Sequence, residues 1–168
     1  MFYKPASSST APNAASKTGF ALSLKGRALR YLSVREQSRS ELERKLAPHE
    51  EVPGQLAAVL DELQEKDFIS ADRVIESVVN RRQDKMGASR IKGELQRKGL
   101  DAEKVLVAIN GLKSTELERA KEVWRRKFNS KTDAGTSAAE RAKQMRFLAA
   151  RGFDADVIRR IVSGRDGH

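Results

Sequence analysis

The chain has 168 residues, of which 39% are hydrophobic, 33% are charged and 5% are aromatic, and its formal net charge is +10. It contains no cysteine, which excludes disulfides and cysteine-based metal sites. No stretch approaches the roughly 18 apolar residues that a transmembrane helix needs, and residues 1–20 lack the apolar core of a secretory signal. We therefore expect a cytoplasmic protein that begins with a disordered tail at residues 1–20.

Beyond residue 20, the sequence predicts a first helix over residues 24–35 and a second over residues 38–47. Apolar residues recur in both at the spacing of one helix face, with Leu42 and Leu46 on the face of the second. Ser38 or Ser40 can accept a hydrogen bond from the first free backbone N–H groups of that helix.

A third and a fourth helix follow, and their starts are marked by different residues. Pro53 suits the first turn of the third helix, and Ser70 suits the N-cap of the fourth. Their apolar faces are formed by Leu56, Val59, Leu60 and Leu63, and then by Val74, Ile75, Val78 and Val79. This spacing is not the alternation of a strand, and no Asn-Gly or Asp-Gly hairpin turn is present.

The second half of the chain predicts five more helices. They cover residues 88–99, 101–112, 114–128, 140–152 and 154–164, with a loop over 129–139. In the helix at 114–128, Leu117, Ala120, Trp124 and Phe128 form one apolar stripe, which indicates core packing rather than stacking on nucleic-acid bases. The expected fold is all-α, with about nine short helices.

A six-residue turn motif occurs twice. KGLDAE at residues 98–103 returns as RGFDAD at 151–156, a shift of 53 residues. In each copy a cation complements the end of a helix, a glycine ends that helix, an apolar residue packs back, and an aspartate caps the next helix. The same shift places ELERKL at 41–46 on ELQRKG at 94–99.

The repetition predicts three tandem units of three helices each. We place their boundaries at residues 21–67, 68–112 and 113–165. The turn motif is then interpreted as an architectural element that sets the angle between successive helices and contacts no ligand.

The sequence offers little for catalysis. His49 and His168 are the only histidines, and neither belongs to a recognisable catalytic or metal-binding motif. The carboxylates lie on charged helix faces, several with a cation one turn away, as in Glu41 and Lys45, which favours solvent-exposed pairs. We expect no enzyme activity, no cofactor and no metal.

Basic residues cluster near the ends of several predicted helices. The candidates for contact with a partner or with DNA are Arg81, Arg82, Lys85, Arg90, Lys92, Arg125, Arg126, Lys127, Arg141, Lys143, Arg146 and Arg151. Any one of them has an alternative role, since a cation at a helix C-terminus also complements the helix dipole and aids solubility. Their recurrence in successive units favours a surface that faces an anion.

A helix-turn-helix DNA reader is a competing interpretation of residues 94–106. A recognition helix offers Arg, Asn or Gln to base edges near its start, whereas the helices after both turns begin with acidic residues that repel phosphate. The turns therefore favour packing over operator binding.

Three segments, in this order, resemble the three repeats of the RecX family, which regulates the bacterial recombinase RecA. They are REQSRSELERKL at 35–46, GASRIKGELQRKGL at 87–100 and RFLAARGF at 146–153, and the resemblance covers about residues 22–163. One departure is Ala71, where the family often has an acidic residue, although Ser70 can cap that helix instead.

The resemblance implies an elongated, curved array of three-helix units that binds the recombinase filament on single-stranded DNA. Members restrain ATP hydrolysis and strand exchange and dampen the SOS response, and many bind DNA weakly. For this chain we expect a monomer that inhibits the RecA filament in DNA repair and recombination. Two alternatives remain open, a general nucleic-acid-binding helical repeat protein and a scaffold for an unrelated acidic protein.

Overall fold

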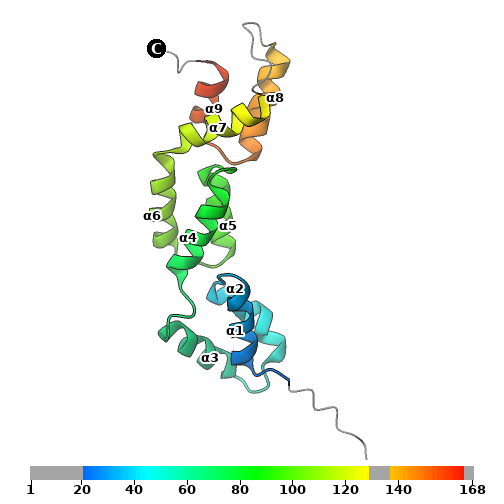
Figure 1. The fold of residues 1–168 in the computed structure, drawn as a ribbon, viewed down its shortest axis with the longest axis vertical. Coiled ribbons are helices and arrows are strands. Elements are labelled where there is room, and N and C mark those ends of the chain that lie inside the picture. Colours follow the sequence, from blue (N-terminus) through cyan, green and yellow to red (C-terminus); the bar gives the residue numbers. More distant parts are fainter. Residues whose placement is uncertain (1–20, 129–136, 165–168) are drawn as a thin grey trace, which may run out of the picture.

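A computed structural model describes residues 21–128 and 137–164, and these residues form nine α-helices, one short 3-10 helix and no strand. The elements are α1 (Leu24–Val34), α2 (Arg39–Leu46), η1 (Ala47–His49), α3 (Gln55–Glu65), α4 (Ala71–Arg82), α5 (Ala88–Arg97), α6 (Ala102–Lys113), α7 (Glu116–Phe128), α8 (Ala138–Ala150) and α9 (Ala155–Val162). They follow one another as three groups of three helices along an elongated, curved array (Figure 1). The predicted all-α repeat fold is confirmed.

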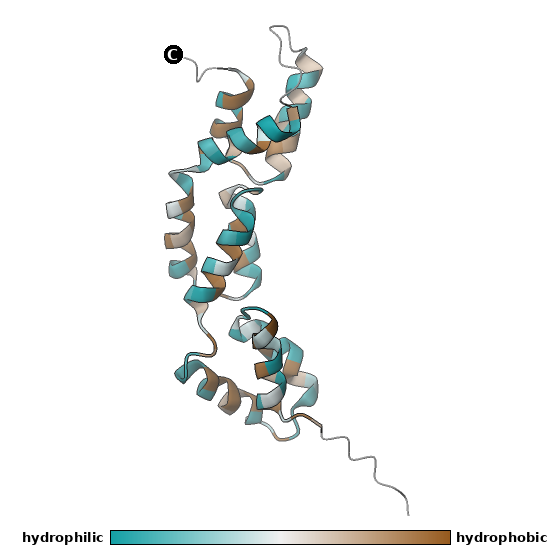
Figure 2. Cartoon of the chain, in the orientation of Figure 1, coloured by the Kyte–Doolittle hydropathy of each residue, from teal (hydrophilic) through white to brown (hydrophobic). Residues whose placement is uncertain are grey.

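Each group of three helices has a hydrophobic core of its own. Leu42, Leu60 and Leu63 are fully buried in the first core, Leu95 in the second and Leu148 in the third. Hydrophilic and hydrophobic residues share the same helices throughout the array (Figure 2), as expected when each helix buries only one face. The boundaries that we place between the units stay a prediction, and the tail at 1–20 lies outside the described residues.

Side-chain caps define most helix starts. Ser38 and Glu41 form a capping box at α2, and Ser70 accepts a hydrogen bond from the backbone N–H of Arg73 at α4, as predicted. The prediction for Pro53 is wrong, because α3 begins two residues later at Gln55. Gly54 stands between them in the left-handed conformation (φ 88°), which a right-handed helix cannot include.

The repeated turns end α5 and α8 as their sequences predict. Gly99 and Gly152 both have positive φ, at 67° and 81°. The apolar residues that follow them, Leu100 and Phe153, pack into the second and third cores respectively. Each turn therefore connects two helices of one unit around a small apolar pivot.

The same turns also join neighbouring units, which the sequence does not reveal. At the first junction the Ser38 hydroxyl donates a hydrogen bond to the carbonyl oxygen of Lys98 (2.6 Å). At the second, the backbone N–H of Gly87 donates to the carbonyl oxygen of Arg151 (2.8 Å), the position equivalent to Lys98 after a shift of 53 residues. In both cases the N-cap residue of a helix in one unit donates a hydrogen bond to the turn of the next unit.

Glu41 is the clearest correction to the sequence-based description. We expected an exposed pair with Lys45, but Glu41 is buried, and its carboxylate accepts hydrogen bonds from Lys98 Nζ (2.7 Å) and from the backbone N–H of Ser38 (2.9 Å). Lys45 instead donates to the side chain of Gln37 (2.9 Å). The physical reason is that the middle unit covers the face of α2 on which Glu41 lies.

Candidate anion-binding interface at the second junction

Four of the candidate cations surround one pocket between the middle and last units. The pocket has a volume of about 320 Å³ and is lined by Asp84, Lys85, Met86, Val123, Arg126, Lys127, Phe147 and Arg151. Its basic residues come from three places in the chain: the turn between α4 and α5, the last turn of α7, and the end of α8. Cations that are distant in sequence are thus brought to a single apolar-walled hollow.

Arg119 fixes the turn that carries Lys85. Its guanidinium donates hydrogen bonds to the backbone carbonyls of Gln83 and Met86 (both 2.9 Å) and of Leu112 (3.0 Å). Burial lowers the pKa of Arg119, although the nearby acidic groups oppose that shift. We did not select Arg119 from the sequence, where no local signal distinguishes it from the neighbouring surface cations.

A buried carboxylate holds the start of α5 against α7. Glu116 accepts a hydrogen bond from the backbone N–H of Ala88 (2.9 Å), and its side chain is buried at the junction. The N-terminal N–H groups of a helix favour an anionic partner, so this contact satisfies a donor that α5 cannot satisfy internally. Together with Arg119, it ties the turn before α5 and the start of α5 to α7.

The apolar wall of the pocket consists of Met86, Val123 and one aromatic side chain, Phe147. The guanidinium of Arg151 lies 4.1 Å from the centre of the Phe147 ring, and Phe147 contacts Phe128 edge to face at 5.2 Å between ring centres. Trp124 donates from Nε1 to the side chain of the buried Gln144 (3.0 Å), which agrees with the predicted packing role of Trp124. A cation held over an aromatic ring beside further cations suits an anion that also has an apolar face.

A second, smaller group of cations lies at the same junction. Arg90 lines another pocket, of about 490 Å³, together with Arg97, which we did not select from the sequence. The remaining lining residues are small or polar, namely Ser89, Gly93, Ala149, Ala150 and Gly152. The structure therefore offers cationic hollows of two kinds at this junction, one with an aromatic side chain in its wall and one without.

For Arg81, Arg82 and Arg125 the structure shows ion pairs with carboxylates of the chain itself. Arg81 and Arg82 both contact the carboxylate of Glu94, at 3.1 and 2.8 Å. Burial alone would raise the pKa of Glu94, but these two cations outweigh that effect and lower it. Arg125 pairs with Glu122 at 2.7 Å on the exposed face of α7. These three residues already have an intramolecular role.

The other four candidates are exposed and lie outside both pockets. Lys92 is on α5, whereas Arg141, Lys143 and Arg146 are on α8. Within the described ranges 21–128 and 137–164, no group of three or more acidic or histidine side chains could hold a metal ion. No helix in these ranges is long and apolar enough to cross a bilayer.

Comparison with known proteins places both ends of the array in one family. The family model for "RecX, first three-helix domain" matches residues 25–63, and the model for "RecX, third three-helix domain" matches residues 114–162. The solved structure of RecX from Lactobacillus salivarius superposes with a TM-score of 0.71 at 25% identity, covering 85% of this chain and 94% of that one.

Relatives of known name are much closer in sequence. The Regulatory protein RecX of Leptothrix cholodnii is 50% identical over 84% of this chain and 88% of its own length. The Regulatory protein RecX of Ralstonia nicotianae is 46% identical over 86% of this chain and 89% of its own. The similarity covers 84% and 86% of this chain, so the chain belongs to the RecX family of regulatory proteins.

Proposed function

We propose that the chain modulates the RecA recombinase filament on single-stranded DNA, mainly as an inhibitor. It would bind along the filament and restrain ATP hydrolysis and strand exchange during DNA repair and the SOS response. Membership of the RecX family is the observation that carries this proposal, because the match runs along all three units and not along one of them. The protein acts as a monomer in the cytoplasm, with unit boundaries at residues 21–67, 68–112 and 113–165.

The shape of the array supports this function. Units joined in series present a long surface, and such a surface can contact several subunits of a helical filament at once. Each junction is tied by hydrogen bonds between a helix start and the next turn, which limits how far the units move apart. An array whose units keep their spacing can match the repeat of a filament.

The contact with the filament is assigned to the pocket at the second junction. Lys85, Arg126, Lys127 and Arg151 form its centre, and the exposed candidates Arg90, Lys92, Arg141, Lys143 and Arg146 are further contacts. Arg81, Arg82 and Arg125 contribute less, because each is paired with a carboxylate of the chain itself. Phosphates of DNA and carboxylates of the recombinase are both suitable anions.

The deciding experiment measures ATP hydrolysis by recombinase filaments on single-stranded DNA while the full chain is added. The proposal expects inhibition at amounts of the chain at or below the amount of recombinase. Absence of inhibition at those amounts, with intact binding to bare DNA, contradicts it.

A second candidate is a nucleic-acid-binding role that needs no recombinase. The specific observation in its favour is the cationic pocket with Phe147 in its wall. That function expects strong affinity for bare single-stranded DNA with a steep decrease as salt rises, since binding then rests on phosphate contacts. Weak affinity for bare single-stranded DNA, with little dependence on salt, favours the recombinase filament as the target.

A further inference from the structure

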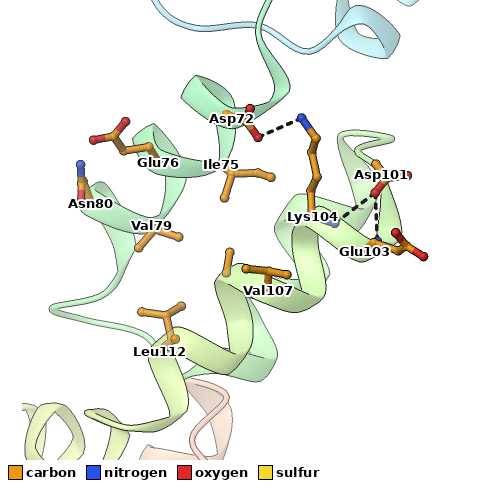
Figure 3. A pocket seen from close by; sticks show the side chains of 12 residues that line it. Asp72, Ile75, Glu76, Val79, Asn80, Asp101, Glu103, Lys104, Val107 and Leu112 are labelled. Atoms are coloured by element: carbon orange, nitrogen blue, oxygen red, sulfur yellow. Dashed lines mark hydrogen bonds and ion pairs between the residues drawn. The ribbon is translucent and has the colours of Figure 1, made fainter.

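A groove of opposite character lies on the middle unit, between its first and third helices. It has a volume of about 670 Å³. Ile75 and Val79 reach into it from α4, opposite the face of α6 that carries Val107, and an ion pair between Asp72 and Lys104 closes one end (Figure 3). Its floor is therefore apolar and is formed by two helices.

The rim of this groove is acidic, in a chain whose net charge is strongly positive. Of the twelve lining residues, four are acidic and one is basic. The acidic ones are Asp72, Glu76, Asp101 and Glu103, and the basic one is Lys104, which is paired with Asp72. Such a rim repels phosphate and attracts cationic side chains, so the groove suits protein and not nucleic acid.

Two exposed apolar residues of α6, Leu106 and Val107, have no large apolar counterpart at the equivalent positions of the other two units. Leu106 and Val107 are 51% and 73% exposed. A shift of 53 residues places them on Arg159 and Arg160 in the last unit, which are also exposed.

The first unit gives the same contrast. Its buried residues Leu56, Leu60 and Leu63 have the spacing of Val105, Ile109 and Leu112, and this alignment sets Ala57 and Ala58 opposite Leu106 and Val107. Three copies of one fold thus carry Ala-Ala, Leu-Val and Arg-Arg at the same exposed positions. The fold does not require large apolar residues there, so their presence in the middle unit points to a contact.

We propose that the groove between α4 and α6 docks a cationic amphipathic helix of a partner protein. The apolar stripe of that helix would cover Ile75, Val79 and Val107, and its flanking lysines or arginines would pair with the acidic rim. A helix is the appropriate occupant because the described residues form no sheet edge to which a strand could add. This site goes beyond the proposed function and does not depend on the identity of the filament.

The probe is a designed peptide of about 14 residues, close to the length of α6, with leucines at i, i+3, i+4 and i+7 flanked by lysines. Two control peptides test the two components of recognition: one has the same composition in scrambled order, and the other has glutamate in place of lysine. Binding to the full chain is measured by fluorescence anisotropy, and its position by NMR shifts of backbone amides. We expect the first peptide to bind at least tenfold more tightly than either control and to shift amides of α4 and α6.

The variants use the repeat as an internal control. Val107→Arg introduces the residue that the last unit already carries at this position, so the variant is expected to fold, and it should weaken peptide binding about tenfold. Ala58→Arg adds the same charge at the equivalent position of the first unit and should leave binding unchanged. Glu76→Lys should weaken binding of the lysine peptide and strengthen binding of the glutamate peptide.

Several outcomes would overturn the proposal. They are equal binding of the three peptides, equal effects of Val107→Arg and Ala58→Arg, or shifts that map to α3 or α9. Shifts of the α4 and α6 amides by a single-stranded oligonucleotide would assign the groove to nucleic acid. Self-association that Val107→Arg abolishes would assign it to a second copy of the chain. Because no recombinase is present, failure here leaves the proposed function untouched.

Discussion

Glu41 and Lys98, 57 residues apart in sequence, form a buried ion pair of 2.7 Å that joins the first unit to the middle one. The same carboxylate accepts a hydrogen bond from the backbone N–H of Ser38, and Arg35 contacts it at 3.0 Å. The glutamate thus completes the capping box of α2 and binds the neighbouring unit at once. The cap and the junction therefore depend on a single charge.

Replacing Glu41 by glutamine should destabilise the protein strongly. The change leaves Lys98 buried without a countercharge, and the loss of one partner of a buried pair costs about 3 kcal/mol. Urea unfolding followed by circular dichroism at pH 7 measures this loss. Glu43→Gln is the matched control, because Glu43 makes an exposed pair with Arg39 on the same helix, and it should change the free energy of unfolding by less than about 0.5 kcal/mol. Equal effects of the two substitutions would contradict a special role for Glu41.

The pair also predicts how stability depends on pH. Burial on its own would raise the pKa of Glu41, but the hydrogen bonds from Lys98, Ser38 and Arg35 outweigh it and lower the pKa from 4.5 to about 2. A lowered pKa stabilises the folded state above pH 4.5, and this contribution is lost as the pH falls from 4.5 toward 2. Thermal unfolding across this range should show a steeper decrease for the natural chain than for Glu41→Gln. If the natural chain and Glu41→Gln lose stability in parallel as the pH falls, other carboxylates cause the acid sensitivity.

The second junction depends on a glycine that the neighbouring unit contacts closely. Gly152 has a φ of 81°, and a Cβ atom there would lie 2.6 Å from the backbone nitrogen of Arg90. Gly152→Ala combines backbone strain with this clash, and we expect a loss of about 3 kcal/mol in the free energy of unfolding. Gly54→Ala has similar strain but no atom within 4 Å of the new Cβ, so it should cost only about 1 kcal/mol. If both variants lose the same free energy of unfolding, the neighbouring unit relieves the clash at Gly152 without cost.

Local patterns predicted the helices and their turns well, because those elements depend on residues that are neighbours in sequence. Ser38, Ser70, Gly99 and Gly152 have the caps and turns that their spacing indicates. The contacts between units were not predictable in this way. Nothing in the sequence around Glu41 distinguishes its partner Lys98 from the nearer Lys45, since the choice is made when the middle unit packs against α2.

The sequence identifies which residues are basic, but it does not indicate which of them line a common pocket. Lys85 and Arg151 are 66 positions apart and line one pocket, whereas the adjacent Arg125 and Arg126 differ in role. Arg119 is not recognisable from the sequence because its three carbonyl partners, on Gln83, Met86 and Leu112, all belong to the middle unit. Charge clustering in a sequence indicates that a surface is basic, but only the packing of units decides which cations converge.

The sharpest test of the cationic pocket compares two adjacent arginines. Arg126 lines the pocket, whereas Arg125 pairs with Glu122 on the exposed face of the same helix. Arg126→Glu and Arg125→Glu change the net charge equally, so a difference between them reports position and not overall electrostatics. We expect Arg126→Glu to weaken binding to recombinase filaments about tenfold and Arg125→Glu to weaken it less than about threefold. Binding is measured by anisotropy of labelled chain at two salt concentrations, with circular dichroism to confirm helicity. If the two variants weaken binding equally, the filament responds to the general charge of α7, and the pocket at the second junction is not its contact.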